Sequence, residues 1–153
     1  MARPFPLRAG LRACLLVAVC AGTTACTTQT VQSGSGAVAG TSPLQSVERF
    51  LAAVNARDLD DMMAVFGTRE GPIRGDRAEN EIWMDAIASI LEHRRYEIVS
   101  ERQVPGREFP TTRVGVTLTI GGEVYPDVTF ITIRTDEGRW MVQEVDLERI
   151  TGN

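Results

Sequence analysis

The chain contains no lysine, only one histidine, and no cysteine after residue 26. A disulfide framework or a cysteine-based zinc site needs several thiols inside the folded part, so neither can form after residue 26. The spacings of histidine- and aspartate-based metal motifs are also absent. The sequence therefore predicts a domain held together by apolar packing, with no metal and no cofactor.

Positive charge is scarce in the larger part of the chain. All 16 basic residues are arginine, and Arg3, Arg8 and Arg12 precede Cys26, whereas all 20 acidic residues follow it. The part after Cys26 thus has 13 arginines and a formal net charge of −7. Binding to nucleic acid requires a basic stripe that neutralises phosphates. We therefore expect no nucleic-acid partner.

The sequence has no apolar run long enough to span a membrane. The run from Leu15 to Ala21 falls well short of the ~20 residues that a membrane-spanning helix needs. Preceded by the three arginines, it is typical of the hydrophobic region of a secretory signal. We expect residues 1–25 to be an export signal that is removed.

The segment Thr23-Thr24-Ala25-Cys26 resembles the lipobox of bacterial lipoproteins. In that family small residues precede a cysteine that receives the lipid, and the resemblance implies that Cys26 is the lipid anchor. Thr23 departs from the aliphatic residue usual at this position, which leaves open cleavage after Ala25 by an ordinary signal peptidase. Cys14 and Cys20 fit the pattern less well.

The residues that follow Cys26 are typical of a flexible tether. Residues 27–40 are rich in Thr, Gln, Ser and Gly, and we take 26–41 as the tether. By resemblance to the sorting rule of Gram-negative lipoproteins, Thr27 after the cysteine favours the outer membrane. We therefore expect a lipid-anchored protein of the cell envelope that faces the periplasm.

Three helix starts are visible in the first half of the domain. Ser42, Asp58 and Asp76 can each cap a helix, and Gln45 and Glu79 occupy the capping-box position of the first and third. The apolar spacing predicts a first helix closed by residues 55–57 and a short second helix. A loop at 67–76 should follow. A longer third helix places Trp83, Ile87, Ile90 and Leu91 on one face and ends at residues 93–95.

From Tyr96 onwards the apolar period changes to two. We expect strands at 96–104, 113–120, 128–135 and 140–147, with a tight two-residue turn at Gly121-Gly122. Helices followed by an antiparallel meander predict an α+β domain over residues 42–150, with a short tail at 151–153.

Two segments resemble the nuclear transport factor 2-like superfamily, also called the ketosteroid isomerase-like cone. Residues 50–66, FLAAVNARDLDDMMAVF, resemble its opening helix pair, and residues 136–147, DEGRWMVQEVDL, its closing hairpin and last strand. The closest similarity is to small bacterial lipoproteins of unassigned function. The resemblance implies N-terminal helices packed in a curved four-stranded antiparallel sheet, a cone-shaped, cystatin-like roll. Superfamily members commonly dimerise through the open face of the sheet.

The sequence predicts no catalytic residue from a recognised motif, and Glu144 and Asp146 are its candidate carboxylates. A regular strand would place both on one side together with Trp140 and Val142. If that side faced the cone, they would form a carboxylate pair suited to acid–base chemistry. If it faced water, they would be solubilising charges, and the opposite, more apolar side favours this alternative.

The remaining distinctive residues have simpler explanations. Trp83, Tyr96, Tyr125 and Trp140 could line a pocket for a small apolar ligand, although aromatic residues in a small domain are more often core. We expect His93 to be a surface cation at a helix end. The acidic residues at 58, 60 and 61 are better explained by helix capping than by metal binding.

These features favour a non-enzymatic domain that binds a ligand or a partner. The partner could be a second copy that pairs through the open sheet face. An isomerase- or dehydratase-like enzyme, with carboxylates or a tyrosine in the cone, is the alternative. A purely structural role in the envelope also stays open. Fold alone does not choose among these.

Overall fold

The computed structural model describes residues 39–152. Cys26, the predicted export signal and most of the predicted tether lie outside the described residues. Among the described residues, no helix is long and apolar enough to cross a membrane.

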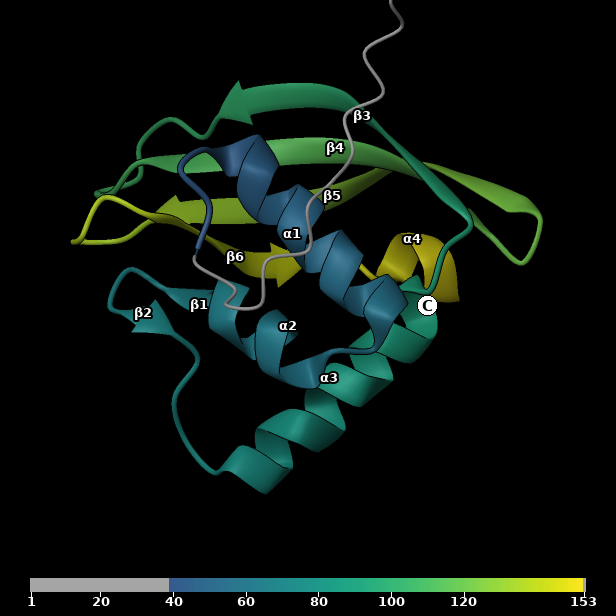
Figure 1. The fold of residues 1–153 in the computed structure, drawn as a ribbon. Helices are drawn as coiled ribbons and strands as arrows, with labels where there is room; N and C mark the ends of the chain where they lie inside the picture. The colour runs from purple at the N-terminus through teal and green to yellow at the C-terminus, as the bar shows by residue number, and fades with distance from the viewer. Residues whose placement is uncertain (1–38, 153) are drawn as a thin grey trace, which may run out of the picture. The chain divides into compact units, whose positions relative to one another are not determined.

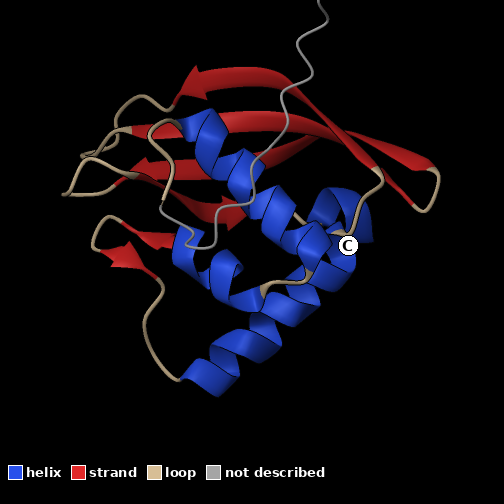
Figure 2. Ribbon diagram, viewed as in Figure 1, coloured by secondary structure: helices blue, strands red, loops and turns tan. Residues whose placement is uncertain are grey.

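The described residues form an α+β fold in which helices precede a sheet, as predicted (Figures 1 and 2). The four-stranded antiparallel sheet has the order β3-β4-β5-β6. A two-stranded hairpin, β1-β2, lies between the second and third helices. The elements are α1 (Pro43–Ala56), α2 (Leu59–Val65), β1 (Gly67–Thr68), β2 (Gly71–Pro72), α3 (Arg77–Leu91), β3 (Arg95–Gln103), β4 (Thr111–Ile120), β5 (Glu123–Arg134), β6 (Trp140–Val145) and α4 (Glu148–Thr151).

The three predicted helix caps are confirmed. The side chains of Ser42, Asp58 and Asp76 accept hydrogen bonds from backbone N–H groups three residues later, at 3.2, 2.9 and 3.0 Å. Gln45 differs from a regular capping box, because its Oε1 accepts from the backbone N–H of Thr41 rather than from that of Ser42. Each helix start is thus fixed by local hydrogen bonds that the sequence itself encodes.

The predicted loop at 67–76 contains the short β1-β2 hairpin. Gly67 pairs with Pro72, and a side chain at Gly67 would lie 2.1 Å from the carbonyl oxygen of Gly71. The preceding residue, Phe66, bridges in parallel to Val142 of β6. The hairpin therefore begins beside the last strand of the sheet.

The long strands follow the predicted pattern, with β5 starting five residues earlier than expected. The turn at Gly121-Gly122 has φ values of 59° and 93°, the conformation that a two-residue hairpin of this type requires. A register shift opposite Val116–Leu118 absorbs one extra residue of β5. Pro126 stays in the strand because it lies at this bulge, where a missing N–H is tolerated.

The core lies between the helices and one face of the sheet, which we call the inner face. In Figure 1 α1 crosses in front of this face. Phe50 of α1 packs against Phe66 and Phe130, with ring centroids 5.8 and 6.4 Å apart. The buried hydrophobic residues of the domain cluster around them, and Phe50 and Phe130 are fully buried. The side chains of the protein itself therefore fill the space between helices and sheet.

The prediction that His93 is a surface cation is wrong. α3 ends at Leu91, and the His93 side chain is buried, with Nδ1 2.9 Å from the carbonyl oxygen of Leu91. Asn55, at the end of α1, accepts from the backbone N–H of His93 at 3.1 Å and donates to its carbonyl at 3.0 Å. This two-sided contact joins the end of α1 to the chain that leads from α3 into β3.

We expect Asn55→Ala to lower the free energy of unfolding by about 2 kcal/mol, because it leaves partly buried backbone groups of His93 without partners. Urea unfolding followed by circular dichroism measures the change. The control is Asn80→Ala on α3, since the Asn80 side chain makes no hydrogen bond within residues 39–152. Equal stability of the two variants would contradict a structural role for Asn55.

Candidate interaction surface on the sheet

Glu144 and Asp146 do not form a carboxylate pair inside the core. β6 has a register shift at Gln143, so Val142 pairs with Thr132 on the inner face while Glu144 pairs with Ile131 on the opposite face. Glu144 is exposed, and Asp146 lies beyond the strand, where its backbone N–H donates to Thr129 at 2.8 Å. The expected sharing of one side by residues 140, 142, 144 and 146 is therefore wrong, because the bulge interrupts the alternation.

The four candidate pocket aromatics lie apart. Trp83 is 43% exposed on α3, with its ring 5.1 Å from that of Phe66. Tyr96 is 38% exposed on β3, with its ring 5.6 Å from that of His93. Tyr125 lies on β5, and Trp140 begins β6. No common pocket is formed by these side chains.

Both tyrosines hold their protons more tightly than free tyrosine does. Burial, followed by the nearby charge of Glu48, raises the pKa of Tyr96. The hydroxyl of Tyr125 donates to Glu123 at 2.9 Å, and this hydrogen bond is the main cause that raises the pKa of Tyr125. At neutral pH both phenols are therefore protonated, and neither can serve as a general base.

Trp140 lines an open groove of about 770 Å³ at one end of the sheet. The groove lies between the start of α1 at Pro43, the β3–β4 loop and the ends of the strands. Its lining mixes apolar side chains with two arginines, Arg107 and Arg134, and two glutamates, Glu101 and Glu108. Among the described residues no three side chains of the metal-ligating types gather into a possible metal site.

Within residues 39–152 no helix covers the sheet face opposite the core. All four helices contribute side chains to the core on the inner side or pack against it. We call the open part of the opposite face the outer face. By strand register its residues are Arg95, Glu97, Ser100, Arg102, Arg113, Gly115, Thr117, Thr119, Val124, Asp127, Thr129, Ile131 and Glu144.

At the centre of the outer face two polar side chains occupy the space that Gly115 leaves by having no side chain. A Cβ at Gly115 would lie 2.2 Å from Oδ1 of Asp127 and 2.5 Å from Oγ of Ser100. Both polar groups therefore lie directly over the Gly115 backbone. Sequence reasoning treated this stretch as ordinary alternation and missed Gly115, although a glycine within a strand often marks a close approach of another backbone.

One end of this sheet side is closed by loops. Met141 and Ile133 pair with each other and are covered by Ala39 and Phe109. The guanidinium of Arg69 lies 4.1 Å from the centre of the Phe109 ring. This closure buries the apolar end of the face and leaves the outer face as defined above uncovered.

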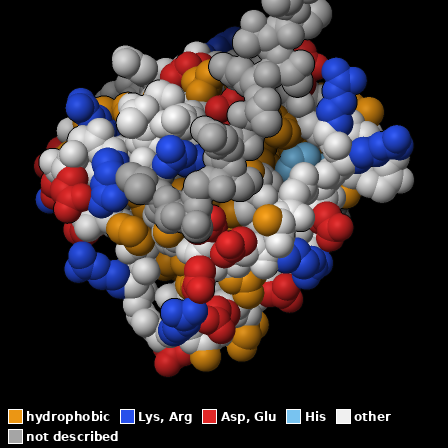
Figure 3. Space-filling view, viewed as in Figure 1, with side chains coloured by type: hydrophobic (Ala, Val, Ile, Leu, Met, Phe, Trp, Pro, Cys, Tyr) orange, Lys and Arg blue, Asp and Glu red, His pale blue; other side chains and the backbone are white. Residues whose placement is uncertain are grey.

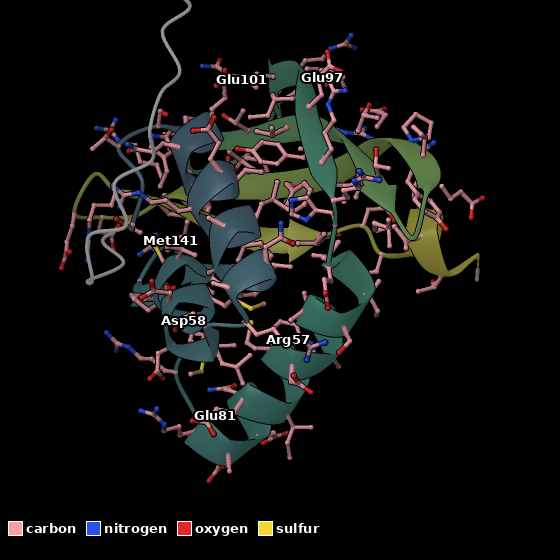
Figure 4. The ribbon with its side chains drawn as sticks, turned by 45° about the vertical axis from the view of Figure 1, so that its right-hand side comes forward. Arg57, Asp58, Glu81, Glu97, Glu101 and Met141 are labelled. Carbon is pink, nitrogen blue, oxygen red and sulfur yellow. The ribbon has the colours of Figure 1, made fainter. Side chains whose placement is uncertain are left out.

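The two sheet edges are unequal. The edge of β6 is occupied, since Gly40 pairs with Trp140 and Phe66 with Val142. The edge of β3 has a bulge at Val99 and many charged residues, two features that discourage edge pairing. Figure 4 shows Glu97 and Glu101 on this strand at the top of the view. A partner therefore has better access to the outer face than to either edge.

Several charges on the helix side are paired within the chain. Arg57 contacts Asp85 at 2.9 Å, and Arg77 contacts Asp60 and Glu81 at 2.7 and 2.6 Å. Figure 3 shows acidic and basic side chains interspersed over the lower part of this side. On the outer face, by contrast, none of the charged residues makes an ion pair within residues 39–152.

No protein-family model matches the chain, and no curated protein matches it. A crystal structure from Thiobacillus denitrificans, described as a calcium/calmodulin-dependent protein kinase type II association domain, is similar with a TM-score of 0.48 and 24% sequence identity. The match covers 69% of this chain and 91% of that chain. This likeness identifies neither a family nor an activity for this chain.

We expect both tyrosines to ionise above pH 10 in the folded protein, and Glu123→Gln to lower the midpoint of Tyr125 alone, because it removes the acceptor's charge. Carbon NMR of the two phenol rings during an alkaline titration resolves each residue. Because the pKa of each tyrosine is higher in the folded than in the unfolded protein, each contributes to the free energy of unfolding. That contribution is complete below the pKa of the unfolded state and is lost as pH rises through the pKa of the folded state. A midpoint below that of the unfolded chain for either residue would contradict the raised pKa values.

Proposed function

We propose that this chain is an envelope lipoprotein anchored through Cys26, and that its domain is a non-catalytic binding module of the nuclear transport factor 2-like superfamily. In this proposal the module binds a second copy of itself through the outer face. The single observation that carries the binding role is the uncovered, regular outer face on a domain whose interior is filled.

The filled interior favours binding over catalysis. Within residues 39–152 the buried polar side chains are one serine, one histidine and several threonines, and no carboxylate is among them. An acid–base enzyme would need such a group facing an internal pocket. Glu144, the exposed candidate, instead belongs to the outer face.

The anchor rests on the sequence and on the point where the described fold begins. Ala39 packs against Met141 and Ile133, and Gly40 pairs with Trp140, so the domain begins just after the Ser- and Gly-rich segment. In this proposal the 12 residues from Thr27 to Val38 serve as the predicted tether, and a flexible chain of that length would reach about 20 Å. That reach would let two anchored copies meet near one membrane. We propose that this is the outer membrane and that the domain faces the periplasm.

Pairing of two copies is supported by the charge balance of the outer face. The face has three arginines and three carboxylates, whereas the part of the chain after Cys26 has a formal net charge of −7. Most surfaces of two copies would therefore repel, and this face would not.

We expect Cys26→Ala to remove the domain from the membrane fraction, or to leave the uncleaved precursor, without loss of folding. Fractionation of a Gram-negative host and intact mass spectrometry measure this, with the wild-type chain as the reference. An unmodified wild-type chain that starts at Cys26 would overturn the anchor, while leaving the pairing proposal untouched.

We expect Ile131→Arg to weaken self-association at least about tenfold, or ~1.4 kcal/mol, because it places an unpaired charge at the centre of the interface. Analytical ultracentrifugation of the detergent-solubilised protein measures association. Ile82→Arg is the matched control, since Ile82 is 74% exposed on α3, away from the sheet. A wild-type protein that stays monomeric would contradict the pairing.

A further inference from the structure

Arg102 and Arg113 are direct cross-strand neighbours on the outer face. They pair in the register of β3 and β4, and both side chains are exposed. Like charges directly opposite each other on neighbouring strands destabilise a sheet. Neither arginine has a carboxylate within ion-pair distance in residues 39–152. The domain alone therefore leaves a repulsive pair without an anion.

Arg113 is held in a defined position. Its Nε and Nη2 donate to Oγ1 of Thr129 at 3.2 and 2.8 Å, and Thr129 is buried. The guanidinium is thus fixed over β5, with donors left for a further acceptor. Arg102 and the fixed guanidinium of Arg113 together make a positive region that is suited to a carboxylate, because a charge-assisted hydrogen bond from Arg102 would offset their repulsion.

Glu144 is the unpaired carboxylate in the same cross-strand row. The register runs from Arg102 to Arg113, then to Ile131 of β5, and then to Glu144 of β6. Three interstrand spacings, about 14 Å, separate Arg102 from Glu144 in one chain. The two charges cannot form an ion pair within that chain.

A two-fold arrangement brings these charges together. When two sheets stack face to face with aligned strands, a two-fold axis between β4 and β5, parallel to the strands, places β3 of one copy over β6 of the other. The row that contains Arg102 then faces the same row in reverse order. Glu144 of the second copy lies over Arg102 and beside Arg113, and the contact occurs twice.

We propose that Arg102 binds Glu144 of a second copy, with the positive charge of Arg113 nearby, and that this contact sets the register of the dimer. The inference rests on the proposed pairing through the outer face. It adds the residues that decide which way the two sheets face each other. Arg102 and Glu144 then determine specificity, because a like-charged substitution at either one leaves an unpaired charge in the interface.

The test uses the full-length chain in the envelope of a Gram-negative host. Thr117→Cys, on the outer face beside the predicted axis, reports pairing through a short bifunctional thiol reagent. Wild type without this substitution shows any reaction at the native cysteines. Arg102→Glu and Glu144→Arg are each expected to lower cross-linking about tenfold, and the double charge swap is expected to restore most of it.

Thermal stability separates lost pairing from lost folding. In the Thr117→Cys background, Arg102→Glu removes the repulsion from Arg113 within one copy. We therefore expect the monomer of this variant to have a melting temperature no lower than that of the parent monomer. Arg74→Glu is the matched control, because Arg74 is exposed in the loop between β2 and α3 and does not belong to the outer face. Its cross-linking is expected to stay within about twofold of the parent.

Two results would overturn the inference while sparing the proposed pairing. In the first, the Arg102 and Glu144 single variants cross-link like the parent while Ile131→Arg does not. In the second, both single variants lose cross-linking but the double charge swap fails to restore it. Absence of cross-linking in the parent, with a monomer in ultracentrifugation, would instead overturn the pairing together with the inference.

Discussion

The packing of Phe50 between Phe66 and Phe130 is the contact on which the rest of the structure depends. It joins α1 to the end of α2 and to the middle of β5, so one side chain holds three elements together. The same packing fills the inner side of the sheet. Because close-packed interiors leave no room for a ligand without rearrangement, the surfaces available for binding lie outside this core.

Three bulges decide which side chains the outer face presents. They lie at Val99, in β5 opposite Thr117, and at Gln143. Each shifts the alternation by one residue, and the last one separates Glu144 from the core-facing Val142. The result is an outer face with balanced charge that the chain itself does not pair, in contrast to the helix side, where Arg57 and Arg77 find carboxylates.

The end of the tether and the short hairpin protect one edge of the sheet. Gly40 and Phe66 pair with Trp140 and Val142 along the edge of β6. Ala39 packs on Met141, whose side chain lies on the sheet side opposite the core. The opposite edge, β3, is protected by its own bulge and charges. Two copies of a domain whose sheet edges are closed in this way can stack their sheets face to face without the risk of open-ended strand addition.

The sequence by itself determined the features that depend on near neighbours. The caps at Ser42, Asp58 and Asp76, the Gly121-Gly122 turn and the helix-then-strand order follow from local hydrogen bonds and apolar periods. Only the tertiary structure decided the burial of His93, whose backbone partner, Asn55, is 38 residues away, and the outward orientation of Glu144. Periodicity cannot reveal a bulge, because the extra residue is specified by pairing with a distant strand and not by its own neighbours.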